Sequence, residues 1–124
     1  MTPIAMLLVD DDARFRAAAA ELLGSAGFVI RAEAETGQAA LDAARIHRPD
    51  VVLLDVQLPD MDGFEVARRL WAAKGPPAIV LVSTREAVDY GRRVTEPGIT
   101  GFINKARLSG EALRAMLDKE EHRT

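Results

Sequence analysis

Three runs of four apolar residues, none interrupted by a polar side chain, most constrain the fold of this chain. They occupy residues 6–9, 51–54 and 79–82. Continuous rather than alternating runs are typical of strands buried on both faces, as in a parallel sheet covered by helices. Residues 29–34 alternate between apolar and polar positions, which favours an edge strand. The short segment 101–104 is expected at the opposite edge.

The segments between these strands carry apolar residues at helical spacing. The first places the following side chains on one helical face: Phe15, Ala18, Ala19, Leu22, Leu23 and Ala26. Asp12 can cap the start of this helix. Further helices are expected over about 36–47, 64–71 and 86–95 and from Ser109 onward, and 86–95 has the weakest apolar pattern.

Strand and helix alternate five times, which predicts an α/β fold with a five-stranded, doubly wound sheet. We expect one domain over residues 1–118, followed by a charged tail over 119–124 that frays. The 124 residues are 48% hydrophobic and 28% charged, with a net charge of −3 and no cysteine. These values disfavour direct binding to nucleic acid and exclude disulfides and thiolate metal sites. Neither a membrane span nor a signal peptide is apparent, so a cytoplasmic protein is expected.

Chemically active side chains follow the ends of these strands. Asp10, Asp11 and Asp12 follow the first run, and Asp55 follows the second. Ser83 and Thr84 follow the third run, and Lys105 follows segment 101–104. The carboxyl edge of an open α/β sheet is where ligands bind, so these groups are expected to share a pocket. Carboxylates, a hydroxyl and an ammonium group together suit a hard divalent cation and a phosphoryl group.

Each of these residues also has a simpler explanation. Asp12 is explained by helix capping, which typically contributes ~0.3–1 kcal/mol, but Asp10 at a buried strand end is not. Adjacent carboxylates repel each other unless a cation neutralises them, and all-oxygen ligands indicate Mg²⁺ or Mn²⁺ rather than zinc. Ser83 could merely terminate a strand, and Lys105 alone would be an ordinary surface lysine. Asp55 directly follows four apolar residues, and a carboxylate beside a cation can attack phosphorus to give an aspartyl-phosphate.

Read together, these segments resemble the receiver domain of bacterial two-component response regulators. The resemblance covers nearly the whole chain and rests on four motifs in order: Leu7-Leu8-Val9-Asp10-Asp11, Leu54-Asp55 with Leu58-Pro59-Asp60-Met61-Asp62-Gly63, Leu81-Val82-Ser83, and Gly101-Phe102-Ile103-Asn104-Lys105. It implies a flavodoxin-like sheet with strand order 2-1-3-4-5.

The resemblance also implies a role for each residue of the site. Asp55 would be the phosphoacceptor, and Lys105 would pair with the phosphoryl group. Mg²⁺ would be held by Asp11, Asp55 and the backbone carbonyl of Gln57, with Asp10 assisting through water. Two further residues would form the switch, with the hydroxyl of Ser83 turning toward the phosphoryl group and Phe102 acting as the aromatic switch residue.

The sequence departs from the family pattern at two positions. The family usually has proline with a cis peptide after its lysine, whereas Ala106 follows Lys105 here. A non-proline cis bond costs ~2.5–4 kcal/mol, so we expect this peptide to be trans. Thr84 replaces the usual small alanine after the switch hydroxyl. Both changes bear on the geometry of switching, and neither removes a reacting group.

The expected partner is a sensor histidine kinase or a phosphotransfer protein, which donates from a phosphohistidine. Phosphorylation would change the surface formed by segments 86–95 and 101–104 and the last helix, and a homodimer can form through that face. One alternative is a Mg²⁺-dependent phosphohydrolase with an aspartyl nucleophile, although the short connections leave no cap domain. The other is a receiver-like interaction module that works without phosphorylation. The sequence leaves open the cognate kinase, the output, and whether the receiver stands alone or was cut from a longer regulator.

Overall fold

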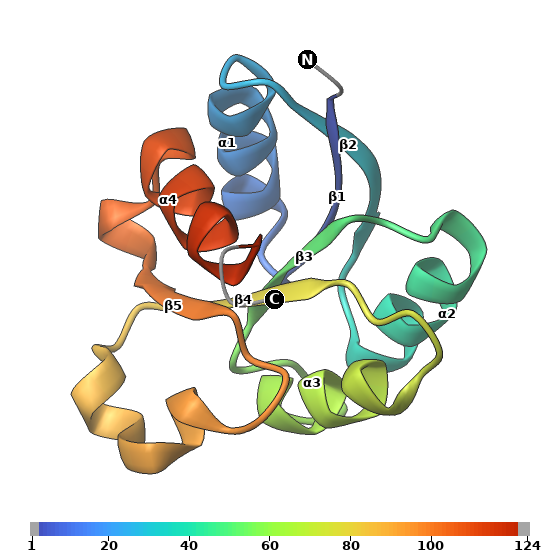
Figure 1. Cartoon of the computed structure of the whole chain (residues 1–124), viewed down its shortest axis with the longest axis vertical. Helices are drawn as coiled ribbons and strands as arrows, with labels where there is room; N and C mark the ends of the chain where they lie inside the picture. Colours follow the sequence, from blue (N-terminus) through green and yellow to red (C-terminus); the bar gives the residue numbers. More distant parts are fainter. Residues whose placement is uncertain (1–2, 122–124) are drawn as a thin grey trace.

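The computed structural model describes residues 3–121 and has one sheet with helices on both sides (Figure 1). Its five strands are parallel and lie in the order β2-β1-β3-β4-β5, which confirms the expected flavodoxin-like topology. The strands are β1 (Ile4–Val9), β2 (Phe28–Ala34), β3 (Val51–Asp55), β4 (Ala78–Ser83) and β5 (Gly101–Asn104). The helices are α1 (Ala13–Gly24), α2 (Gly37–His47), α3 (Gly63–Ala72) and α4 (Gly110–Glu121), with 3-10 segments η1 (Ala87–Thr95) and η2 (Lys105–Arg107).

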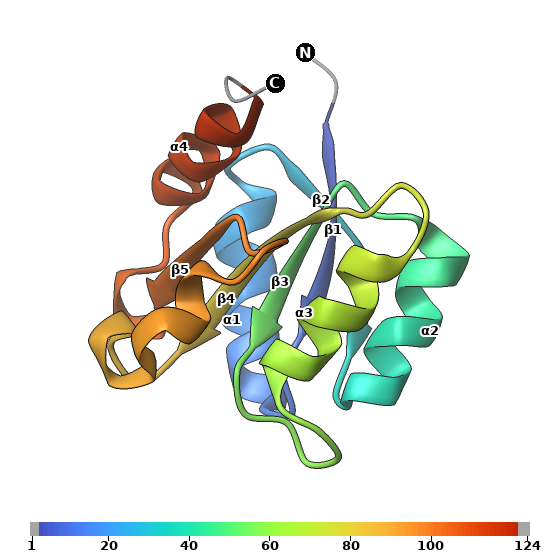
Figure 2. The same ribbon diagram turned by 60° about the horizontal axis from the view of Figure 1, so that its bottom comes forward.

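Alternate residues of the central strands divide the core into two layers. Leu7, Val52 and Leu81 pack with α2, α3 and the inner residues of η1. Leu8 and Leu53, one residue further along their strands, pack with α1 and α4 on the other face. Figure 2 shows α2 and α3 together on one side of the strands and α1 and α4 on the other. Because both faces are covered, the inner strands need apolar residues at every position, which explains their continuous runs.

The helices begin where polar side chains can accept their free N–H groups. Asp12, Thr36 and Asp62 cap α1, α2 and α3, and Ser109 Oγ accepts from the Ala112 N–H in the first turn of α4. The carboxylate of Asp60 accepts the N–H groups of Gly37 and Gln38 at 2.7 and 2.9 Å. These two hydrogen bonds hold the pKa of Asp60 below its ordinary value and tie the loop after β3 to the start of α2.

The helix expected over 86–95 is the main local difference, because η1 is a 3-10 segment with a break. Gly91 has φ 62° and ψ −135°, outside any helical conformation. The apolar residues of η1 are too few to bury a helical face, and Val88 is 83% exposed. A poorly buried segment with a glycine break therefore does not keep α-helical hydrogen bonding.

Smaller differences concern the helix faces and the C-terminal boundary. Within α1, Ala18 and Leu22 are exposed, while Ala19 and Leu23 are buried. The apolar stripe is therefore narrower than its spacing predicts. The charged tail expected from residue 119 begins inside α4, which continues to Glu121, and residues 122–124 lie outside the described part of the chain.

Candidate functional site

The end of β1 supplies two of the three carboxylates of the site. Asp10 follows the strand directly and is 1% exposed, while Asp11 is exposed. Asp10 Oδ1 accepts the backbone N–H of Asp12 at 2.9 Å, and Arg16 Nη1 donates to the carbonyl oxygen of Asp10 at 2.6 Å. Asp12 itself turns to the helix, where its Oδ1 accepts the N–H of Arg14 at 2.9 Å. The expected role of Asp12 as the cap of α1 is confirmed.

Asp55 is the last residue of β3, at the centre of the sheet, and is 6% exposed. Its Oδ1 accepts the N–H of Gln57 at 3.3 Å. The following loop folds back tightly, because the Gly63 N–H donates to the Val56 carbonyl at 2.6 Å. A side chain at Gly63 would overlap the carbonyl oxygen of Asp55. The loop thus requires glycine at the position that supports the strand end carrying Asp55. The role given to the Gln57 carbonyl stays a prediction.

Lys105 brings a cation to these carboxylates from the end of β5. Its Nζ lies 2.6 Å from Asp10 Oδ2 and 3.6 Å from Asp55 Oδ2. The ammonium also lies over the Phe15 ring, 4.4 Å from its centroid. The Lys105–Ala106 peptide is trans, as expected. Asn104 supports this path, because its Oδ1 accepts the Ala106 N–H at 2.8 Å at the start of η2.

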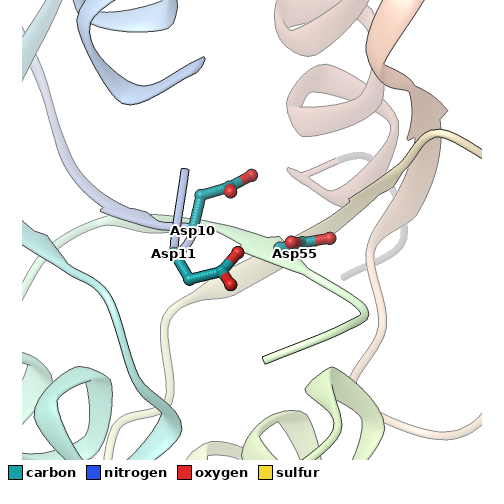
Figure 3. A group of neighbouring side chains, drawn as sticks. All are labelled: Asp10, Asp11 and Asp55. Atoms are coloured by element: carbon teal, nitrogen blue, oxygen red, sulfur yellow. The ribbon is translucent and has the colours of Figure 1, made fainter. Parts of the chain in front are cut away.

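The three carboxylates lie close enough to act on one cation. Asp10, Asp11 and Asp55 each offer an oxygen within 4.8 Å of the others, and Figure 3 shows the three side chains beside one another. Among residues 3–121 no donor is aligned for a hydrogen bond to Asp10 Oδ2, so its contact with Lys105 is an ion pair without hydrogen-bond geometry. Three neighbouring carboxylates, two of them buried, form an all-oxygen set that fits a hard cation such as Mg²⁺.

Burial and the neighbouring charges change the pKa values of Asp55 and Lys105. Burial, followed by the charge of Asp10, raises the pKa of Asp55 to about 6, although Lys105 and the Gln57 N–H act in the opposite direction. Burial alone would lower the pKa of Lys105, but its close contacts with Asp10 and Asp55 outweigh burial and raise it. At neutral pH Asp55 is therefore mostly ionised and Lys105 carries an ammonium group, which suits attack by Asp55 on an electrophile.

The expected switch residues lie beside this cluster without joining it. Within the described part of the chain, the Ser83 hydroxyl makes no hydrogen bond to Asp55 or Lys105. It lies 2.7 Å from the Tyr90 hydroxyl and accepts the Arg85 N–H at 3.0 Å. The Phe102 ring lies against the Tyr90 ring, with 5.7 Å between centroids. Thr84, where the family usually has alanine, is exposed.

Sequence reasoning missed four residues that support the site. They are Phe15 over the Lys105 ammonium, Arg16 on the Asp10 carbonyl, Tyr90 on the Ser83 hydroxyl, and Asn104 before the Lys105 turn. The position of Asn104 next to Lys105 was a usable signal, since asparagine commonly caps turns. Phe15 lies far from Lys105 in sequence, whereas Arg16 and Tyr90 lie only six and seven residues from Asp10 and Ser83. No local pattern marks any of these three contacts.

The sequence of this chain matches a known protein family. Residues 6–118 match the family described as response regulator receiver domain. A putative transcriptional regulator from Pseudomonas aeruginosa is 34% identical over 110 residues, covering 89% of this chain and 53% of that protein. A probable transcriptional regulatory protein NarL from Mycobacterium tuberculosis is 32% identical over 116 residues, covering 93% and 54%. The chain spans about half the length of the curated relatives that it matches.

Solved structures agree with this assignment. The signal receiver domain of the putative response regulator NarL from Mycobacterium tuberculosis superposes with a TM-score of 0.86 at 30% identity, covering 98% of both chains. Between residues 3 and 121, no helix has the length and apolar character needed to cross a bilayer. A motif match over most of the chain, the strand order and the acidic site at the carboxyl edge all agree, and the chain belongs to the family of response regulator receiver domains.

Proposed function

We propose that this receiver domain accepts a phosphoryl group on Asp55 and thereby switches its interaction surface. The observation that carries the proposal is the position of Asp55: a buried carboxylate at the end of the central strand, beside Asp10 and Asp11 and 3.6 Å from Lys105 Nζ. Asp10 is already engaged by Lys105 at 2.6 Å and Asp11 is exposed. Asp55 is thus the carboxylate best placed for attack on a phosphorus atom.

The reaction is a transfer from nitrogen to oxygen. An ionised Asp55 oxygen attacks the phosphorus of a phosphohistidine, and the new O–P bond forms as the P–N bond breaks. The imidazole leaves with the electron pair and takes a proton from solvent. Lys105 stabilises the charge on the phosphoryl oxygens. Because Asp55 has a pKa of about 6, it is mostly ionised at pH 7 and above and ready to act as the nucleophile.

The cation we propose for this site is Mg²⁺, held by Asp10, Asp11, Asp55 and the backbone carbonyl of Gln57. When bound, it would offset the negative charge that accumulates between the carboxylates and the incoming phosphoryl group. The support is the close approach of the three carboxylates, of which Asp10 and Asp55 are buried. A separate general acid is not needed, because imidazole is a good leaving group.

The phosphodonor we propose is a histidine kinase or a phosphotransfer protein, and the place of action is the cytoplasm. Receiver domains interact with such proteins, and this chain is a signalling switch of that family. The output surface would be η1, β5 and α4, through which a homodimer can form. The relatives named as transcriptional regulators are about twice as long as this chain. Direct contact with nucleic acid by this acidic domain is not expected, given its net charge of −3.

Intact mass measurement with a small phosphodonor tests the proposal. In the presence of Mg²⁺, the protein should gain the mass of one phosphoryl group, and Asp55→Asn should gain none. Asp12→Asn is the matched control, since Asp12 caps α1 and should leave the adduct unchanged. Multiple-turnover hydrolysis would indicate a phosphohydrolase instead. A wild-type protein that gains no adduct would indicate an interaction module, and an adduct on Asp55→Asn would refute the assignment of Asp55.

A further inference from the structure

The hydroxyl of Ser83 is occupied by a residue outside the acidic cluster. Ser83 ends β4 and is 3% exposed. Because it lies two residues after Leu81, its side chain faces the same side of the sheet, which α2 and α3 cover. There its Oγ lies 2.7 Å from the hydroxyl of Tyr90. The Arg85 N–H, at 3.0 Å, supplies a second hydrogen bond to the same oxygen. Two partners therefore hold the Ser83 hydroxyl on the side of η1.

Tyr90 is placed by two other aromatic rings. Its ring meets Phe64 of α3 edge-on, with 5.6 Å between centroids and 61° between planes. On the other side it meets Phe102 of β5 at 5.7 Å and 53°. Such tilted pairs are favourable and directional, so the two neighbouring rings orient the half-buried Tyr90 ring. A movement of Phe102 or of Ser83 therefore changes a contact of Tyr90.

The segment that carries Tyr90 is weakly held. None of the residues 87–95 is fully buried, and Gly91, the next residue, breaks the segment with φ 62°. Long 3-10 segments are uncommon and often mark hinges. Arg93 also contacts Asp62 at 3.2 Å and lies over the Phe64 ring at 4.1 Å, and Val94 packs against the same core layer as Tyr90. Tyr90 is thus an inner anchor of a segment that can move at small cost.

We propose that Tyr90 is a positioning residue that holds the Ser83 hydroxyl in the unphosphorylated state and releases it when Asp55 is modified. The inference rests on the proposed function. A phosphoryl oxygen is an acceptor, so Ser83 must turn toward it and donate its single hydroxyl hydrogen. That movement breaks the contact with Tyr90 and frees the inner anchor of η1. The competition between Tyr90 and the phosphoryl group for one hydroxyl thereby links Asp55 to the output surface.

Affinity for beryllofluoride, a phosphoryl mimic, measures this competition in the full chain with Mg²⁺. Tyr90→Phe keeps the ring and removes the hydroxyl, so the inactive state alone loses a hydrogen bond. Affinity should then rise roughly 2- to 10-fold, as expected for one neutral hydrogen bond present in only one of two states. The fluorescence of Trp71, the single tryptophan, can report binding, because its side chain packs on Gly98 just beyond η1.

A double-mutant cycle separates this role from a merely structural one. In a Ser83→Ala background, Tyr90→Phe should leave the affinity for beryllofluoride unchanged, because no hydroxyl remains to be released. An equal gain in that background would overturn the proposal, as would an unchanged or weaker affinity when Ser83 is present. Thermal unfolding confirms that each variant is folded. If the wild-type protein bound no beryllofluoride and gained no phosphoryl adduct, the proposed function itself would fail, and the role of Tyr90 with it.

Discussion

Replacing the Asp55 carboxylate by an amide should make the protein more stable at neutral pH. Burial, and after it the charge of Asp10, raises the pKa of Asp55 from 3.8 to about 6. The folded state therefore binds this proton more tightly than the unfolded chain does. Stability from this group is present at low pH, falls as the pH rises from 3.8 to about 6, and is absent above that range. Asp55→Asn removes the cost of a buried charge.

The magnitude follows from the two pKa values. At ~1.4 kcal/mol for each pKa unit, the difference between 3.8 and about 6 corresponds to ~3 kcal/mol in the free energy of unfolding. Asp55→Asn should therefore gain up to ~3 kcal/mol at pH 7.5. At about pH 5 most of the wild-type Asp55 is protonated in the folded state, and linkage predicts that the advantage falls by ~1.4 kcal/mol. The carboxylate that we propose as phosphoacceptor thus lowers stability in the resting protein.

Urea unfolding of both proteins at pH 7.5 and pH 5, with a chelator present, measures these differences. Glu21→Gln, which removes an exposed carboxylate from α1, is the control and should change stability little at either pH. Adding Mg²⁺ at pH 7.5 should stabilise the wild-type protein more than Asp55→Asn. The reasoning is refuted if Asp55→Asn is less stable than wild type at pH 7.5, or if its advantage does not depend on pH.

Two further predictions concern the residues around Asp55. Asp11→Asn should lose most of the Mg²⁺ affinity and Asp12→Asn should keep most of it, because Asp11 belongs to the carboxylate group and Asp12 caps α1; equal losses in a calorimetric titration would contradict this division. Gly63→Ala should lose ~1–3 kcal/mol of stability and slow adduct formation, because its Cβ would overlap the Asp55 carbonyl. Gly24→Ala is the matched control, because Gly24 lies in open space at the end of α1, where alanine should gain up to ~1 kcal/mol of stability. If thermal unfolding showed the same change in stability for Gly63→Ala and Gly24→Ala, the argument would be wrong.

The sequence alone predicted the strands of the sheet and much of the site. Continuous apolar runs identified the inner strands, and the rule that parallel strands end at one edge brought Asp10, Asp55 and Lys105 together, as the 2.6 and 3.6 Å contacts show. The trans peptide at Lys105 followed from the loss of proline. These features depend on periodicity and backbone energetics, which a single sequence displays directly.

Other features depend on contacts that a single sequence does not display. Segment 87–95 contains inward residues at helical spacing, but Gly91 and the shortage of apolar surface leave it as a 3-10 segment. The contact between Ser83 and Tyr90 requires β4 and η1 to be packed first. Asp60 is a residue type common in turns, yet its carboxylate caps α2 from the loop after β3. In each case tertiary packing decides among several uses that local chemistry allows.

Lys105 and Ser83 reach the Asp55 region from opposite faces of the sheet. The Lys105 ammonium lies over Phe15, which belongs to the α1 and α4 layer. The Ser83 hydroxyl meets Tyr90, which belongs to the layer of α2 and α3. The sheet lies between these two layers. A group at its carboxyl edge lies beside both layers, so it can contact both. The phosphoryl group proposed for Asp55 would have several acceptor oxygens there, enough to bind an ammonium from one layer and a hydroxyl from the other. A single modification at this edge can therefore change the packing on both faces of the sheet.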